Sequence, residues 1–208
     1  MIGRSDIDME SNQDMEILDV GCGISKIKGA FGVDFRDLPG VDLHYDLNVL
    51  PWPFEKNRFD KICFSHSISH LSDVISVIKE CHRILKENGT IEIVAPHYSC
   101  DNSFTDPTIK HSFSSRSMGY CVQNSKMSSQ YNYIGNISLQ QTLAYISFRQ
   151  AECSWRKKVK INPYKIIGFE YICNKFPRIY EKFFSFIIPA TEVYFVLKKT
   201  SKEKNSIS

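Results

Sequence analysis

An apolar run that ends in a glycine turn, followed at once by a second apolar run ending in a carboxylate, constrains the fold of this chain most. The stretch is "ILDVGCGISKIKGAFGVDF" over residues 17–35, with Gly21 and Gly23 between Asp19 and Asp34. Glycines let the backbone adopt positive φ and let its N–H groups approach a ligand closely. In an open parallel sheet, ligands bind beyond the carboxyl ends of the strands, where Asp34 could accept two hydrogen bonds from a ribose diol. The stretch therefore predicts a sheet that binds a nucleotide-like ligand.

Three classes of ligand compete for such a turn. A P-loop is excluded because no Gly-Lys-Ser/Thr follows the glycines. A nicotinamide dinucleotide requires a third glycine, a helix after it and an acidic residue about 20 positions further on. Here "GCGISK" has no third glycine, and Asp34 comes only 11 residues after Gly23. S-adenosylmethionine is the third candidate and stays compatible, because it has no pyrophosphate that needs a helix dipole.

Apolar patterns along the rest of the chain predict an α/β fold. Continuous apolar runs predict strands within residues 15–21, 30–35, 41–47, 58–67, 90–97, 164–174 and 190–199. Apolar residues at helical spacing predict one helix over 71–89, with Ser72 or Asp73 as its cap and Asn88-Gly89 as a left-handed end, and another over 138–152. We expect a Rossmann-like, mostly parallel seven-stranded sheet with helices on both faces and an antiparallel last strand.

Length and composition indicate one domain. We expect it to span residues 1–200, with 97–162 as an insertion or lid and 201–208 as a disordered tail. The chain has no apolar stretch of about 20 residues and no apolar signal region, so we expect it in the cytoplasm. Its seven cysteines are odd in number and contain no CxxC pair, which argues against a disulfide scaffold or a zinc site.

Charge is unevenly distributed along the chain. Residues 1–154 contain 14 Lys and Arg against 19 Asp and Glu, whereas residues 155–208 contain 12 against 4. Such asymmetry is compatible with an anionic partner and also with a solvated face followed by a basic tail. The sequence contains no recognised RNA-binding module, so a nucleic acid is not the expected partner. The aromatic-rich segment 176–189 could close a pocket or form the face of a homodimer.

Four motifs occur in an order that resembles a known family. "ILDVGCG", "GVDF", "YDLNVLPWPFEKNRFDKICFSHSISHL" and "ECHRILKENGTIEIVAPH" are similar to the successive motifs of class I S-adenosylmethionine-dependent methyltransferases of the type 11 group, over roughly residues 16–100. The resemblance implies S-adenosylmethionine as cofactor. It also implies roles for matching residues: Asp19, Gly21, Cys22 and Gly23 under the methionine part, Asp34 at the ribose, Phe35 beside the adenine, Asp46 at the adenine amino group, Leu47 as an apolar wall, and Ser65 under the sulfonium with His66 next to it.

The sequence also departs from that family. Ser25 stands where a third glycine or small residue is usual, and "ISKIKGA" leaves room only for a turn or loop in place of the first helix. A shortened subgroup found among surface-polysaccharide gene clusters is similar, and it shares much of "APHYSCDNSFTDPTIKHSFSSRS". Ile109 stands where that subgroup would have a histidine. Asp34 could instead be a strand-end cap, and Asp46 a turn residue.

Candidate acceptor residues follow the fourth and fifth predicted strands. His66, His70 and His97 all fall at the carboxyl edge of the sheet, where the methyl group would be transferred. An oxygen acceptor requires a base, and we expect His97 or His66 in that role, or as an orienting donor, with Asp106 aiding. His70, Lys110, His111 and Arg116 could bind the acceptor, the last three through an anionic group. The same histidines could bind a metal with Asp106, but no tight ligand spacing supports this.

The expected function is therefore methyl transfer to a small molecule or to a glycan intermediate of a surface polysaccharide, most simply onto oxygen. Two alternatives stay open: a methyltransferase acting on RNA or protein, and an inactive partner subunit that binds the cofactor.

Overall fold

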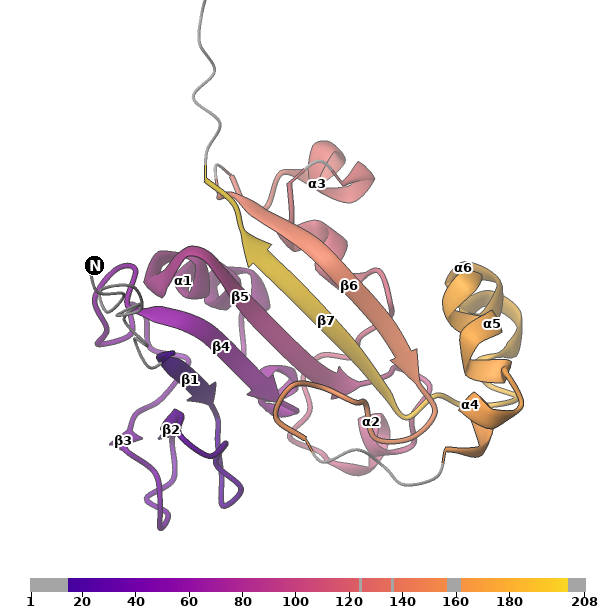
Figure 1. Cartoon of the computed structure of the whole chain (residues 1–208), viewed down its shortest axis with the longest axis horizontal. Helices are drawn as coiled ribbons and strands as arrows, with labels where there is room; N and C mark the ends of the chain where they lie inside the picture. Colours follow the sequence, from indigo (N-terminus) through magenta and orange to yellow (C-terminus); the bar gives the residue numbers. More distant parts are fainter. Residues whose placement is uncertain (1–14, 124, 136, 157–161, 202–208) are drawn as a thin grey trace, which may run out of the picture.

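One seven-stranded sheet organises the computed structural model, which describes residues 15–201 except 124, 136 and 157–161. The strand order is β3-β2-β1-β4-β5-β7-β6, and only β7 is antiparallel to its neighbours (Figure 1). The strands are β1 (Ile17–Val20), β2 (Phe31–Asp34), β3 (Leu43–His44), β4 (Phe59–Ser65), β5 (Leu85–Pro96), β6 (Leu139–Ser147) and β7 (Glu192–Lys199). The predicted Rossmann-like fold class, with its antiparallel last strand, is confirmed, although coil rather than helix covers one face of the central strands.

Short helices connect these strands. They are η1 (Ser67–His70), α1 (Val74–Ile84), α2 (Asn102–Thr105), η2 (Ser117–Cys121), α3 (Lys126–Tyr131), α4 (Pro163–Ile166), α5 (Phe169–Lys175), α6 (Pro177–Ile179) and η3 (Tyr180–Phe184). Residues 21–30 between β1 and β2 form turns and coil without a helix, as the short linking sequence predicts. No described helix has the length and apolar character needed to cross a bilayer.

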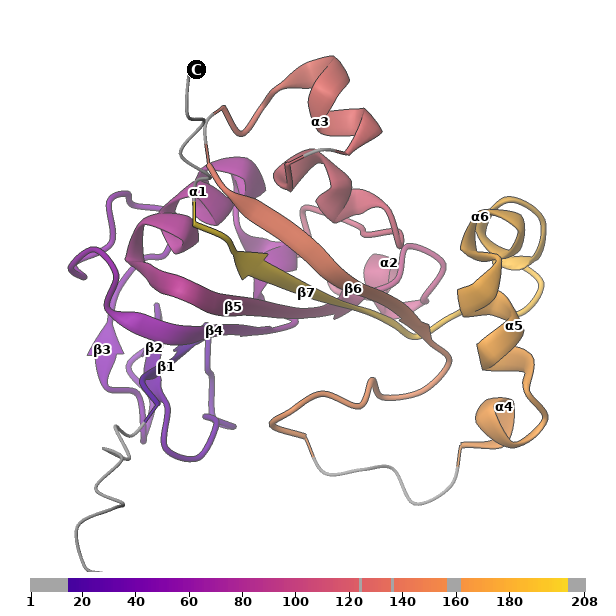
Figure 2. The ribbon, with the colours of Figure 1, turned by 45° about the horizontal axis from the view of Figure 1, so that its top comes forward.

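The main core lies between the sheet and α1. Ile62 and Phe64 of β4 and Ile93 of β5 are fully buried there, against α1 residues such as Ile78. Asp73 caps α1 as predicted, because its carboxylate accepts from the Ser76 N–H at 3.0 Å. Figure 2 shows α1 and α3 on the same side of the sheet.

Coil covers the opposite face of the central strands. Ala151, Cys153 and Trp155 pack there against Val94 of β5 and Tyr194 of β7, and Figure 2 shows the segment after β6 on this side. The face is partly polar. The Glu92 carboxylate lies 2.7 Å from the Lys61 ammonium and accepts from the Tyr194 hydroxyl at 2.6 Å. All seven cysteines are free thiols.

Three predicted elements differ in the structure. The helix predicted over 138–152 is wrong, because residues 139–147 form β6 and pair antiparallel with β7. The strand predicted over 164–174 is also wrong: Asn162 caps α4 by accepting from the Tyr164 N–H at 3.1 Å, and Gly168, at φ 73°, separates α4 from α5. The helix predicted over 71–89 ends at Ile84, because Leu85 already pairs with Phe59 in the sheet.

The left-handed backbone expected at the end of that helix is present at Asn88, with φ 65°, inside β5. The tail expected over 201–208 lies outside the described residues apart from Ser201.

Candidate functional site

The glycine turn after β1 forms a tight elbow against the neighbouring strands. Gly21 and Gly23 have φ of 69° and 55°, a left-handed backbone that side chains disfavour. The N–H groups of Gly21 and Cys22 both donate to the Val33 carbonyl, at 2.8 and 3.1 Å. A Cβ on Gly21 would lie 2.4 Å from the Cβ of Ser67. The elbow therefore touches the segment that follows β4, as a site at the carboxyl edge requires.

Asp34 closes the elbow from the end of β2. One carboxylate oxygen accepts from the Gly23 N–H at 2.8 Å, and the other accepts from the Arg36 N–H at 3.0 Å. Burial raises the pKa of Asp34, but these hydrogen bonds outweigh it and leave the pKa below its ordinary value. The carboxylate is thus ionised and acts as a strand-end cap. Its role at a ribose stays a prediction.

Asp19 lies under the same elbow and carries an unsatisfied oxygen. Only 1% of the residue is exposed. Its Oδ2 accepts from the Ile27 N–H at 2.8 Å, whereas its buried Oδ1 has no hydrogen-bond partner within the described structure. Burial raises the pKa of Asp19 to about 6. The carboxylate oxygen without a partner, Oδ1 of Asp19, lies next to the glycine turn. Such an oxygen fits a cationic amino group, and the methionine part of S-adenosylmethionine carries one.

The other residues predicted to contact the cofactor lie along the same edge. Phe35 is 64% exposed, with the Arg36 guanidinium 5.6 Å from its ring centroid, while Leu47 is buried. The roles of Phe35 beside the adenine and of Leu47 as an apolar wall stay predictions. Asp46 is exposed and accepts from the Asn48 N–H at 2.9 Å, so it is a turn residue in this structure and its adenine role stays a prediction. Burial raises the pKa of the Cys22 thiol to about 11, which makes it a packing residue rather than a nucleophile.

A cavity of about 410 Å³ opens beside the elbow at the carboxyl edge of the sheet. Its lining brings together three of the predicted acceptor residues, the departing residue Ile109 and three that were not singled out: His66, His70, Asp106, Ile109, Pro96, Asn102 and Thr105. Asp106 accepts from the Thr108 hydroxyl at 2.6 Å, and that hydroxyl lies 2.9 Å from Nδ1 of His70. The Thr108 hydrogen bonds hold the pKa of Asp106 below its ordinary value. The cavity thus presents imidazole and carboxylate groups to a polar ligand.

His66 is the lining residue with a carboxylate partner of its own. Its backbone is left-handed, with φ 65°, and its Nε2 lies 2.8 Å from Oε1 of Glu192 at the start of β7. Burial raises the pKa of Glu192, but hydrogen bonds from His66 and from the Ala151 N–H, together with the Arg156 cation, bring the pKa below its ordinary value. Arg156 also donates to the Ser65 hydroxyl at 3.0 Å. The carboxylate of Glu192 is therefore ionised, and it orients the imidazole of His66.

Sequence reasoning missed Glu192 and Arg156. Glu192 reaches His66 because antiparallel pairing puts it opposite Pro96, so the amino end of β7 meets the carboxyl ends of β4 and β5. The one available signal in the sequence is an acidic residue at the start of the last predicted strand. It does not reveal that Glu192 pairs with Pro96.

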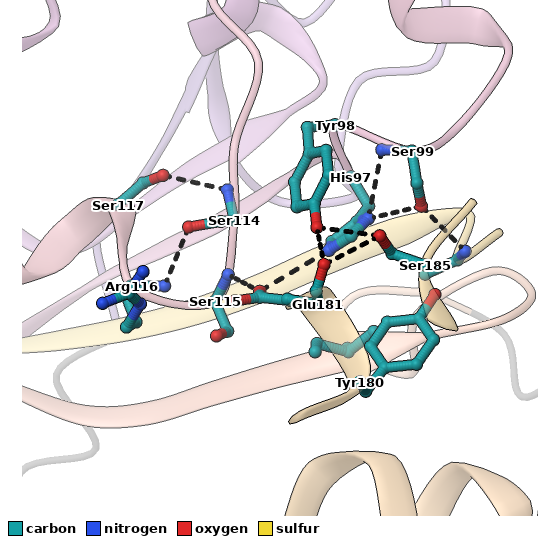
Figure 3. A network of polar contacts seen from close by, with 12 residues as sticks. His97, Tyr98, Ser99, Ser114, Ser115, Arg116, Ser117, Tyr180, Glu181 and Ser185 are labelled. Carbon is teal, nitrogen blue, oxygen red and sulfur yellow. Dashed lines mark hydrogen bonds and ion pairs between the residues drawn. The ribbon is translucent and has the colours of Figure 1, made fainter. Parts of the chain in front are cut away.

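His97 has a different environment, shown in Figure 3. It is fully buried and does not line the cavity. Its Nδ1 lies 2.8 Å from the Ser99 hydroxyl, and its Nε2 lies 3.6 Å from the Glu181 carboxylate. The same carboxylate accepts from the Ser115 N–H at 2.6 Å. In this arrangement His97 joins the end of β5 to η3, and its role as a base stays a prediction.

The three predicted anion-binding residues are not among the side chains that line the His66 cavity. Lys110 donates to the Ser72 hydroxyl at 2.8 Å, and His111 lies 3.3 Å from the Ser72 carbonyl oxygen. His111 lines a second cavity of about 420 Å³ together with three neighbouring tyrosines. Arg116 is exposed at the start of η2. Across the described residues, no three His, Cys, Asp or Glu side chains are grouped so that they could hold a metal ion.

The chain is similar to known methyltransferases in sequence and in structure. A family model described as a methyltransferase domain matches residues 6–158. A SAM dependent methyltransferase from Archaeoglobus fulgidus is similar in structure at 18% sequence identity, covering 89% of this chain and 86% of that chain with a TM-score of 0.50. An S-adenosylmethionine dependent methyltransferase from Mesorhizobium loti is similar at 11% identity, covering 89% and 91% with a TM-score of 0.50. A search of curated proteins finds no match.

Proposed function

This chain belongs to the methyltransferase domain family, and from that membership we propose that it methylates a hydroxyl group of a small molecule or a glycan intermediate. It is an S-adenosylmethionine-dependent methyltransferase. When bound, the cofactor supplies a methyl group on a cationic sulfur. The proposal adds the acceptor class and the residues that handle the acceptor, and its main support is the His66–Glu192 pair in a cavity beside the glycine elbow.

The glycine elbow and the two carboxylates account for cofactor binding. Gly21 and Gly23 supply the left-handed backbone of the turn at the end of β1, and Asp19 offers its unpartnered oxygen to the amino group of the cofactor. Asp34 fixes the elbow through the Gly23 N–H, and we assign the ribose hydroxyls to its ionised carboxylate. We assign the adenine to the exposed ring of Phe35.

His66 is the base of the proposed reaction. A hydroxyl acceptor has a high pKa, so its proton must leave as the methyl–oxygen bond forms. With Nε2–H donating to Glu192, Nδ1 of His66 is the free acceptor that takes this proton (a tautomer assigned from the hydrogen bond). The bound cofactor would supply the methyl group and would leave as S-adenosylhomocysteine, so that the acceptor hydroxyl would become a methyl ether. Glu192 then stabilises the imidazolium.

The size and lining of the cavity support this acceptor class. A space of about 410 Å³ lined by Asn102, Thr105 and Asp106 beside Pro96 and Ile109 offers several hydrogen bonds and an apolar wall, the combination that holds a sugar-sized polyol. His70, fixed through Thr108, adds one more polar contact. The intermediate of a surface polysaccharide is the acceptor that we would test first.

Transfer of an isotope-labelled methyl group tests the proposal. The cofactor is incubated with the protein and a panel of monosaccharides, nucleotide sugars, phenols, RNA and unfolded protein. We expect label in the sugar pool and its loss in His66→Ala, with Lys56→Ala as a surface control. Label in RNA or protein alone would contradict the acceptor class. Calorimetric binding of S-adenosylhomocysteine without turnover on any acceptor would support an inactive cofactor-binding subunit.

A further inference from the structure

Residues 162–187, here called the aromatic lobe, expose an unusual amount of apolar surface. The lobe comprises α4, α5, α6 and η3 and lies at one end of the molecule, beyond β6 and β7 (Figures 1 and 2). Its large exposed apolar residues are Ile166, Ile167, Tyr171, Ile172, Phe176, Ile179, Phe183, Phe184, Phe186 and Ile187. Concentrated patches of this kind mark surfaces that contact another protein or a membrane.

This exposure does not reflect poor packing of the lobe. Cys173 and Tyr180 point inward and are buried with Ile146 and Phe148. Other apolar residues of the lobe, at spacings of three and four, face outward, including Ile179 at 52% exposure and Phe183 at 60%. The lobe therefore has a filled inner side and a separate apolar outer side.

The charges of the lobe are sorted in the same way. Its two carboxylates face inward: Glu170 is fully buried and accepts from the Tyr145 hydroxyl at 2.6 Å, and Glu181 accepts from the Ser115 N–H. All of its cationic side chains are exposed, namely Lys165, Lys175, Arg178 and Lys182. The outer side of the lobe is thus apolar and aromatic, bordered by cations and without an exposed carboxylate.

The cations lie next to the exposed rings. The Lys175 ammonium is 5.7 Å from the Phe176 ring centroid, and the Lys182 ammonium is 5.0 Å from that of Phe183. Side chains arranged like this can put the ring into the acyl boundary of a bilayer and the ammonium at the level of the lipid phosphates.

We propose that the aromatic lobe binds peripherally to the surface of a membrane that contains anionic lipids. The apolar side chains enter the interface, and Lys175, Arg178 and Lys182 pair with lipid phosphates. The fourth cation, Lys165, is already paired with Glu152 at 3.0 Å. A second copy of the chain is a poorer partner, because a symmetric contact would put the same cations opposite one another. The inference does not depend on which acceptor the enzyme methylates.

The lobe is also fixed to the body of the enzyme. The Tyr98 hydroxyl donates to the Glu181 carbonyl at 2.6 Å and lies 2.9 Å from the Ser185 hydroxyl, and His97 faces the Glu181 carboxylate (Figure 3). Tyr98 and His97 directly follow Pro96, which lines the acceptor cavity. A lobe bound to a membrane would therefore hold that cavity at a fixed distance from the bilayer.

Cosedimentation of the full chain with vesicles tests the inference. We use vesicles of phosphatidylcholine alone and of phosphatidylcholine with phosphatidylglycerol, at low and at physiological salt. We expect binding to the anionic vesicles and weaker binding as salt screens the cations. Lys175→Glu/Lys182→Glu should reduce the bound fraction about tenfold or more, whereas the matched reversal Lys56→Glu/Lys126→Glu should not.

A second pair of variants examines the apolar contribution. Phe183→Ser/Ile187→Ser should weaken vesicle binding, and the control Met15→Ser/Val49→Ser, at residues 57% and 54% exposed, should leave it unchanged. Binding of S-adenosylhomocysteine by calorimetry shows that each variant is folded.

The inference is overturned if the wild type stays in the supernatant with both vesicles, or if both controls lose as much binding. It is also overturned if Phe183→Ser/Ile187→Ser abolishes self-association in sedimentation velocity without affecting vesicles, or if an acidic protein competes all of the vesicle binding away.

Discussion

Asp19 and Asp34 end neighbouring strands, yet their surroundings shift their carboxyl pKa values in opposite directions. Hydrogen bonds hold the pKa of Asp34 low, so its contribution to stability is present above its unfolded pKa and is lost as the pH falls through its folded pKa. Burial raises the pKa of Asp19 to about 6. From about pH 4 to about pH 6 the folded protein keeps a proton that the unfolded chain has released, so the free energy of unfolding falls as the pH rises.

The first prediction concerns Asp19→Asn. Because the substitution removes a buried charge, we expect the free energy of unfolding at neutral pH to rise by about 1–3 kcal/mol. Without the charge, the affinity for S-adenosylhomocysteine should fall about tenfold or more. Wild-type affinity should also rise with pH through about 6 as Asp19 ionises, and the variant should lose that dependence. Denaturant unfolding and calorimetric titration measure both effects. A variant with unchanged affinity and an unchanged pH profile would contradict the assignment.

The second prediction concerns the base. We expect His66→Ala to reduce kcat about a hundredfold or more and Glu192→Gln to reduce it less, because the imidazole remains but loses its orienting charge. KM should change little in Glu192→Gln, and Glu192→Asp should recover part of kcat. Steady-state kinetics across pH provide the measurement, with the exposed Glu55→Gln as the matched control. An unchanged pH–rate profile in Glu192→Gln would show that Glu192 has a merely structural role.

At the scale of elements, the segment between β1 and β2 is held by hydrogen bonds and an ion pair of its side chains, where the family usually has a helix. Asp19 accepts from the Ile27 N–H at 2.8 Å, and Asp42 accepts from the Gly32 N–H at 2.7 Å and pairs with Lys26 at 2.7 Å. These contacts fold the segment back over the sheet without helical hydrogen bonds. The elbow then depends on backbone geometry at its glycines rather than on a helix that follows them.

The third prediction therefore concerns Gly21→Ala. An added Cβ would meet the Ser67 Cβ at 2.4 Å, and the φ of 69° is unfavourable for alanine. Gly40→Ala is the matched control, because Gly40 has a φ of 90° but no atom within 4 Å of an added Cβ. Both variants should lose about 1 kcal/mol for the backbone, and Gly21→Ala about 1–3 kcal/mol more for the clash. Thermal unfolding compares them. Equal losses would argue against close contact of the elbow with η1.

The strand–turn–strand of the elbow could be predicted from sequence because its pattern is local. So could the cavity residues His66, His70 and Asp106, since the carboxyl ends of parallel strands share one edge. The errors at 138–152 and 164–174 have a different cause. Apolar residues in β6 fit a helical spacing, and only pairing with β7, some 50 residues later, decides for a strand. In α4 and α5 the cap at Asn162 and the left-handed Gly168 override residues that favour strands.

At the scale of the molecule, the His97 network is what joins the aromatic lobe to the sheet. The fourth prediction is that His97→Ala lowers the free energy of unfolding by about 2–4 kcal/mol, because it leaves a cavity and removes the partner of Glu181. Hydrogen exchange should accelerate in residues 162–187 before it does so in β1 and β4. His44→Ala, at an exposed residue, is the control.

Activity separates this structural role of His97 from a catalytic one. In His97→Ala we expect the kcat of the folded fraction to fall far less than in His66→Ala. A loss of kcat as large as that of His66→Ala, with unchanged exchange in the lobe, would instead restore His97 as the base.

The place of β7 in the sheet bears on how this protein is made. β7 comes last among the strands yet lies between β5 and β6, so β6 joins the described sheet only through it. A nascent chain leaving the ribosome must keep residues 139–147 unpaired until residues 192–199 have emerged. During that interval both β5 and β6 present open strand edges, so synthesis of this enzyme passes through a state in which protection by chaperones matters most.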